Sequence, residues 1–83
     1  METRLGFVGL IVEDRENNAA SVNAVLSEFG ELILARMGVP CPERDCFAIT
    51  LVVRAGTDEL GSLTGRLGRL PGISVKSMLS KAK

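Results

Sequence analysis

The sequence predicts an α+β domain with a four-stranded antiparallel sheet and two helices on one face of that sheet. The first observation is the run Arg4–Glu13, which is apolar on both of its alternating sets of residues. That pattern is typical of a central strand that is buried on both faces. The second observation is that two later segments repeat apolar residues with the helical period, and three short segments have the composition of strands. We therefore expect the order strand, helix, strand, strand, helix, strand.

The first helix is expected to begin in the polar segment that follows the first strand. Asp14 or Asn17 can cap it, because a short side-chain oxygen accepts hydrogen bonds from the free amides of the first turn. Gly30 is expected to end it as the C-cap residue. The stripe predicted to be buried has the spacing i, i+3, i+4, i+7 and consists of Val22, Val25, Leu26 and Phe29.

The second and third strands are predicted at residues 32–37 and 47–54. Gly38, Pro40 and Pro42 are expected to end the second strand, which leaves the segment CPERDC as a polar loop. A loop of this length is too short for a crossover, so the two strands are expected to pair antiparallel. One face of the third strand consists of Phe47, Ile49, Leu51 and Val53, and the other of Ala48, Thr50, Val52 and Arg54.

The second helix is expected to be capped by Thr57 or Asp58 and to end at Pro71 and Gly72. Its predicted core stripe consists of Leu60, Leu63, Leu67 and Leu70. A neighbouring stripe consists of Gly61, Gly65 and Gly68. Glycine within a helix costs about 1 kcal/mol relative to alanine, so we expect another backbone to pass close to this stripe. Residues 73–78 form a shorter, more polar fourth strand that suits the edge of the sheet.

Two strand–helix–strand crossovers around one hairpin make the ferredoxin-like βαββαβ arrangement. We expect a single domain at residues 4–80, with a basic tail at 81–83. Both helices would cover one face, so apolar residues on the other face would be exposed. We therefore predict a homo-oligomer, at least a dimer, held through the sheet. Val52→Asp is expected to split it, whereas Glu28→Lys on the first helix is not.

The composition excludes several classes of protein. The 83 residues carry no net charge, so the chain as a whole has no electrostatic attraction to nucleic acid or membranes. The sequence has neither the pattern of a signal peptide nor an apolar run near the roughly 20 residues that span a bilayer. We expect a cytoplasmic protein in which Cys41 and Cys46 are free thiols. Without histidine, one chain supplies two of the four ligands of a structural zinc site, although two chains could supply four. We predict no metal and no cofactor.

No constellation in the sequence points to catalysis. Glu13, Asp14 and Glu16 are the candidates for a general acid or base, but no nucleophile is predicted beside them. We therefore predict no catalytic residues and no enzyme activity. An RNA-binding domain of this topology needs aromatic platforms on its first and third strands. Phe7 and Phe47 are the only aromatic residues there, and we interpret both as core residues.

Three segments carry a resemblance to a known family: RLGFVGLIVEDRE, SVNAVLSEFGELILARMGVP and TDELGSLTGRLGRLPGISVKSMLSK. Over residues 4–81 the chain resembles the small ACT-like regulators of the iron-only hydrogenase system. The resemblance implies a ferredoxin-like domain that oligomerises through its sheet. The chain is more distantly similar to the C-terminal, ligand-binding domain of nickel-responsive repressors, but it has no histidine to bind nickel. The segment CPERDC departs from the family pattern.

The resemblance implies a non-enzymatic regulatory or sensor module that acts through a small ligand or a partner protein. The alternatives are an interaction subunit that binds no small ligand and an RNA-binding domain. No segment is left over for direct DNA binding once the six elements are assigned. By analogy with ACT domains, a ligand is expected near the end of the first strand, at a subunit boundary. The candidate residues are Glu13, Asp14, Arg15, Asn17 and Asn18, with Arg36 and Gly38 of the segment ARMG as a second group. The alternative for the first group is that it only caps the helix.

Overall fold

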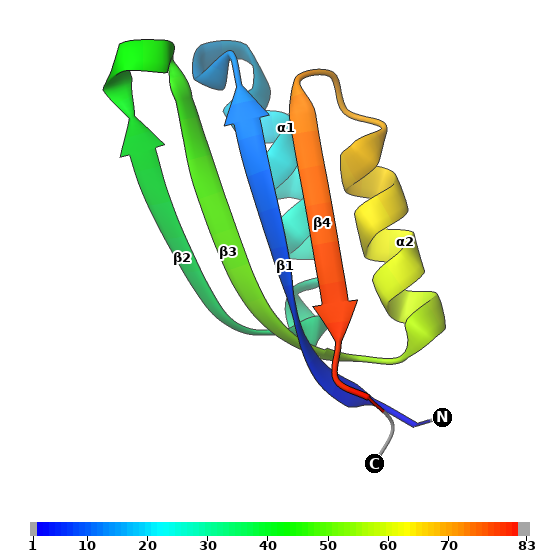
Figure 1. The fold of residues 1–83 in the computed structure, drawn as a ribbon. Helices are drawn as coiled ribbons and strands as arrows, with labels where there is room; N and C mark the ends of the chain where they lie inside the picture. The colour runs from blue at the N-terminus through cyan, green and yellow to red at the C-terminus, as the bar shows by residue number, and fades with distance from the viewer. Residues whose placement is uncertain (1, 82–83) are drawn as a thin grey trace.

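The computed structural model describes residues 2–81, and the sheet lies in front of both helices in Figure 1. The strands are β1 (Arg4–Glu13), β2 (Ile33–Cys41), β3 (Cys46–Ala55) and β4 (Ile73–Leu79), and the helices are α1 (Arg15–Glu28) and α2 (Thr57–Gly68). Two short 3-10 helices, η1 (Gly30–Leu32) and η2 (Pro42–Arg44), flank β2. The antiparallel sheet has the order β2-β3-β1-β4. The predicted ferredoxin-like α+β fold is confirmed.

Two sequence-based expectations concern the end of the chain and its relation to membranes. Of the predicted basic tail at 81–83, residues 82 and 83 lie outside the described residues. Across residues 2–81, no helix combines the length and the apolar character needed to cross a bilayer.

β1 is a central strand, as its composition predicts. It pairs with β3 along its whole length, from Arg4 opposite Ala55 to Glu13 opposite Cys46. On its other side it pairs with β4, which is therefore an edge strand, as expected from its polar composition. β2 forms the opposite edge. The chain that leaves β1 is thus constrained by neighbours on both sides.

The core lies between the sheet and the two helices. β1 contributes one alternating set, Val8, Leu10 and Val12, and β3 contributes Ile49, Leu51 and Val53. The helices contribute Val22, Val25, Leu26, Leu60, Leu63 and Leu67. Phe29 and Leu70, the outer members of the two predicted stripes, are only partly buried and pack at the margin of the core. The predicted helix stripes are therefore confirmed.

The other face of the sheet has no cover from this chain. We define the open sheet face by its large apolar residues, which are Leu5, Phe7, Ile11, Met37, Val39, Val52 and Met78. Each has at least 37% of its surface exposed. The interpretation of Phe7 as a core residue is wrong, because its position in the alternation of β1 points away from the helices. Phe47 is confirmed as a residue that packs against the core.

The predicted end of the second strand is also wrong. β2 continues through Gly38 and Pro40 to Cys41, so the connection to β3 consists of little more than η2. Proline lacks an amide hydrogen and is tolerated in a sheet on an edge strand, where one side of the backbone needs no partner. β2 is such an edge, so Pro40 does not break it.

The helix ends differ in detail from the sequence-based expectations. Asp14 occupies the N-cap position of α1, but it makes no side-chain capping bond. Phe29, not Gly30, is the C-cap residue, and Gly30 begins η1. The N-cap of α2 is Gly56, not Thr57 or Asp58. The amide N–H of Gly56 donates to the carboxylate of Glu59 at 2.9 Å, which is one half of a capping box.

The expectation that a backbone passes close to the glycine stripe of α2 is wrong for this chain. A Cβ added at Gly61 or Gly65 would meet nothing within 4 Å. The close approach lies instead between β1 and β4. A Cβ at Gly6 would come within 2.7 Å of Leu79 Cδ2 and would also overlap the carbonyl oxygen of Met78. Gly6 is therefore a glycine whose missing side chain the close pairing of β1 and β4 requires.

We expect Gly6→Ala to lower the free energy of unfolding by about 1–3 kcal/mol, because β4 would have to move away from β1. Gly61→Ala, which places its methyl group in open space, is expected to raise it by about 0.5–1 kcal/mol. Urea unfolding of both variants and the parent at one protein concentration measures the difference. A Gly6→Ala variant as stable as the parent would contradict the close approach.

Candidate functional site

Three connections of the chain meet at the end of β1. These are the start of α1, the hairpin segment η2 and the turn before β4, all at the upper end of the molecule in Figure 1. Backbone hydrogen bonds join them. The amide of Glu13 donates to the carbonyl oxygen of Gly72 at 2.8 Å, and the amide of Arg15 donates to that of Asp45 at 3.1 Å. We call the residues Glu13, Asp14, Arg15, Asn17 and Asn18 the corner.

Asp14 turns the chain from β1 into α1. It has a left-handed conformation, with φ 52° and ψ 61°, which aspartate tolerates better than most residues. Its carbonyl oxygen accepts hydrogen bonds from the amides of Asn17 and Asn18, both at 3.1 Å. Its carboxylate accepts from the side-chain amide of Asn17 at 2.9 Å. Asp14 and Asn17 are exposed, and their side chains hold each other in place.

Asn18 has a structural role in this turn. Its side-chain amide donates to the carbonyl oxygen of Glu13 at 2.7 Å. Gly72 lies directly against it, with φ +76°, and a Cβ there would come within 2.8 Å of Asn18 Nδ2. This packing gives Asn18 a structural role that is not helix capping, because its side-chain amide is engaged with β1 inside the turn.

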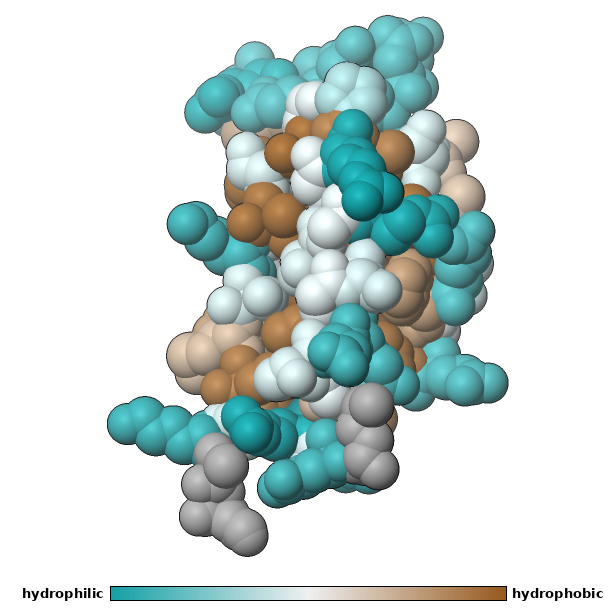
Figure 2. All heavy atoms as spheres, turned by 90° about the vertical axis from the view of Figure 1, so that its right-hand side faces the viewer, coloured by the Kyte–Doolittle hydropathy of each residue, from teal (hydrophilic) through white to brown (hydrophobic). Residues whose placement is uncertain are grey.

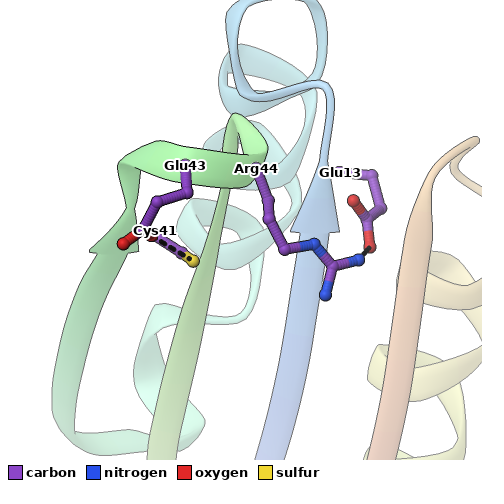
Figure 3. A network of polar contacts seen from close by, with 4 residues as sticks. All are labelled: Glu13, Cys41, Glu43 and Arg44. Carbon is purple, nitrogen blue, oxygen red and sulfur yellow. Dashed lines mark hydrogen bonds and ion pairs between the residues drawn. The ribbon is translucent and has the colours of Figure 1, made fainter.

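The charged groups of the corner are exposed. The guanidinium of Arg15 lies over the ring of Phe47, 5.4 Å from its centroid. Arg44 extends from η2 across the sheet toward β1, where its Nη2 lies 3.7 Å from Glu13 Oε2 (Figure 3). Exposed ion pairs contribute about 0–1 kcal/mol, so this contact orients the two groups without making them unavailable to a ligand.

Arg36 and Gly38 are not brought to the corner. The guanidinium of Arg36 donates to Asn23 Oδ1 on α1 at 2.6 Å. Arg36 and Gly38 pair with Leu51 and Ile49 of β3, well along that strand from Cys46, which pairs with Glu13. The structure therefore gathers the first group of candidate residues and separates it from the second.

Two depressions lie on the surface that residues 2–81 form, away from the corner residues. One, of about 250 Å³, lies at the far end of the helices and is lined by Glu28, Phe29, Glu31, Leu32, Glu59 and Ser62. The other, of about 310 Å³, lies on the open sheet face and is lined by Leu5, Gly6, Phe7, Val52, Met78 and Ser80. Neither depression includes a corner residue, and Asp14, Arg15 and Asn17 of the corner are exposed.

Cys41 and Cys46 stand directly opposite each other on β2 and β3, and no disulfide joins them in this structure. That both thiols are free in the reduced cytosol stays a prediction. The thiol of Cys41 donates to Glu43 Oε1 at 3.3 Å (Figure 3). Burial raises the pKa of the Cys46 thiol, and the neighbouring Cys41 and Glu13 raise it further. Between residues 2 and 81, no cluster contains three or more histidine, cysteine, aspartate or glutamate residues placed to hold a metal.

Sequence reasoning missed three contributors to the corner: Arg44, Asp45 and Gly72. Each comes from a connection that is distant in sequence from β1 and that contacts β1 or the start of α1 only in the folded chain. Gly72 had a partial signal, since it follows a proline at a predicted turn. No sequence signal points to the charged residues of η2, because the pattern of CPERDC predicts only a polar loop.

We expect Cys46 to react with Ellman's reagent more slowly than Cys41 at neutral pH. The thiolate is the reactive form, and the raised pKa of Cys46 keeps its thiol protonated. The reaction rate of Cys46 should keep rising above the pH at which an ordinary cysteine thiol is fully ionised. The variants Cys41→Ser and Cys46→Ser isolate each thiol for the measurement. Equal rates with the same pH profile would contradict the shift.

Comparison with known proteins gives a family-level match. Residues 4–77 match the model of the TM1266-like family, which is described as "Iron-only hydrogenase system regulator, putative". Among solved structures, the uncharacterized protein TM1266 from Thermotoga maritima is similar at 39% sequence identity and a TM-score of 0.92. The alignment covers 96% of this chain and 100% of that one. No curated protein matches the chain.

Two more distant structures share the fold. The ACT domain from GTP pyrophosphokinase of Chlorobium tepidum has 20% identity and a TM-score of 0.77, over 92% of this chain and 99% of that one. An ACT domain protein from Streptococcus pneumoniae has 12% identity and a TM-score of 0.56, over 96% and 97%. These similarities establish that the chain has an ACT-like fold.

Proposed function

We propose that this chain, which belongs to the TM1266-like family of iron-only hydrogenase system regulators, is a non-enzymatic cytoplasmic regulatory module. It acts as a homo-oligomer joined through the open sheet face, and it responds to a small ligand or a partner protein. Family membership and the ACT-like fold support the regulatory part of the proposal. No catalytic role is assigned to any residue.

The observation that carries the proposal is the open sheet face. Its apolar residues come from all four strands, and the depression between Phe7, Val52 and Met78 lies among them. Seen from the β4 side, hydrophobic residues appear on the surface between two ends that are covered by hydrophilic residues (Figure 2). Burying a few hundred Å² of apolar surface per chain contributes several kcal/mol at roughly 25 cal/mol per Å². The entropy lost on association opposes this gain.

We place the ligand site at the corner, completed by a second subunit. The exposed Arg15 guanidinium offers a partner for an anionic group, and the carboxylates of Glu13 and Asp14 offer partners for a cationic one. A small molecule that carries both charges would fit this arrangement. Because the corner is open in one chain, a neighbouring subunit at the boundary would have to supply the rest of the pocket. Arg36 and Gly38 remain a separate, second candidate.

A protein-interaction subunit without a small ligand is the second candidate function, and the absence of a corner residue from either depression favours it. RNA binding is less well supported. Of the two aromatic residues on the central strands, only Phe7 faces the open side, whereas Phe47 packs against the core beneath Arg15. Stacking of successive bases would need both on the open side.

A thermal-shift screen against amino acids, nucleotides and metal salts tests the ligand site. A ligand that prefers the folded protein should raise Tm in a saturable way. The shift should be lost in Arg15→Ala and kept in Arg36→Ala, which removes an arginine outside the corner. If no compound produces a shift, the interaction-subunit function is favoured. A shift that Arg36→Ala alone abolishes would move the site to β2.

Sedimentation velocity at micromolar concentration tests the oligomer. We expect the parent to be at least a dimer and Val52→Asp to be a folded monomer, because a carboxylate on the open sheet face would have to be buried without a partner. Glu28→Lys is a poor control, since Glu28 Oε1 lies 2.7 Å from Arg66 Nη1 and joins the two helices. Ser27→Lys, at an exposed position of α1, is the better one and should stay oligomeric. A monomeric parent would contradict the proposal.

A further inference from the structure

We propose that Cys41 and Cys46 are a reversible disulfide site that is oxidised by a small disulfide such as glutathione disulfide. The two residues are direct partners across β2 and β3, at the end of the hairpin. Directly opposed residues of antiparallel strands have Cα atoms about 4.5–5.5 Å apart. Disulfides join Cα atoms at about 4.4–6.8 Å, so the strand pairing places the two residues within the range that a disulfide spans.

The surroundings of the pair favour a disulfide over a metal site. Two thiols fall short of the four ligands of a structural zinc site, and within residues 2–81 no third ligand completes a cluster. A disulfide needs only the two sulfur atoms. Both are free, and the two strands already hold them in register.

The exposure of the two thiols sets the order of the reaction. Cys41 is partly exposed, whereas Cys46 has only 7% of its surface exposed. The thiolate of Cys41 attacks the glutathione disulfide, forms a mixed disulfide and releases one glutathione thiolate. Cys46 then loses its proton and attacks the Cys41 sulfur, which releases the second glutathione. The two cysteines together lose two electrons and two protons, and one glutathione disulfide becomes two glutathione thiols.

The acidity of Cys46 makes the second step sensitive to pH. Burial and the neighbouring Cys41 and Glu13 raise the pKa of its thiol, so its reactive thiolate forms less readily. The mixed disulfide should therefore persist longer at neutral pH and resolve faster as the pH rises.

The bond would also act on the corner. The ring that it closes contains η2, whose Arg44 lies 3.7 Å from Glu13, and Asp45, whose carbonyl oxygen accepts from the amide of Arg15. Oxidation removes the Cys41 thiol that donates to Glu43 and restrains both ends of η2 (Figure 3). The oxidation state of the pair is thereby coupled to the backbone that supports the corner. This inference does not depend on the proposed function.

The test is oxidation of the full reduced chain in a series of glutathione redox buffers. Intact mass should show a chain that is lighter by two hydrogens, and peptide mapping should show a Cys41–Cys46 link. On a non-reducing denaturing gel the oxidised chain should still migrate as a single chain. Tm should rise by several degrees, because the crosslink restricts the unfolded chain. Two persistent free thiols, a stable glutathione adduct or a chain-to-chain disulfide would each overturn the proposal.

Two matched variants complete the design. Cys41→Ser keeps only the buried thiol and should take up glutathione more slowly than Cys46→Ser, which keeps the exposed one. Neither variant should show the rise in Tm. In backbone amide NMR spectra, the Arg15 signal should shift on oxidation of the parent and stay fixed in both variants. An unmoved Arg15 amide in the oxidised parent would refute the coupling to the corner.

Discussion

β1 lies between two neighbours and carries apolar residues on both faces, and the rest of the molecule follows from the need to bury them. Its pairing with β3 and β4 places it inside the sheet. The two crossovers bring both helices to one face, where they bury Val8, Leu10 and Val12. The opposite set, including Leu5 and Phe7, is left exposed by the same geometry. The surface proposed for assembly is therefore a direct result of the topology.

The corner is the second consequence of this central position. Because β1 ends between β3 and β4, the start of α1 meets both the hairpin and the turn before β4. Hydrogen bonds from Glu13 to Gly72 and from Arg15 to Asp45 fix the backbone there. The side chains of Arg15 and Asp14 remain exposed above this backbone. This rigid support with exposed charges is the basis of the ligand site that we propose at the corner.

Much of the corner could be predicted because it is local in sequence. Glu13 to Asn18 follow one strand and begin one helix, so they lie together in any fold that has these two elements. Arg36 was carried over by resemblance alone, and the structure places it on the helix side of β2, bonded to Asn23. Pro40 misled the prediction of β2, since the rule that proline ends a strand fails at the edge of a sheet.

The sequence by itself determined the order of the elements, the central place of β1 and the buried stripes of both helices, because periodicity and composition report those features locally. It did not determine which face of β1 the helices would cover. Both sets of β1 are apolar, so no pattern distinguishes Val8 from Phe7. The tertiary structure decided which face is covered, because both crossover connections place their helices on the same side of the sheet. It also brought Gly72 and Arg44 to the corner, since contacts between distant segments leave no local pattern in the sequence.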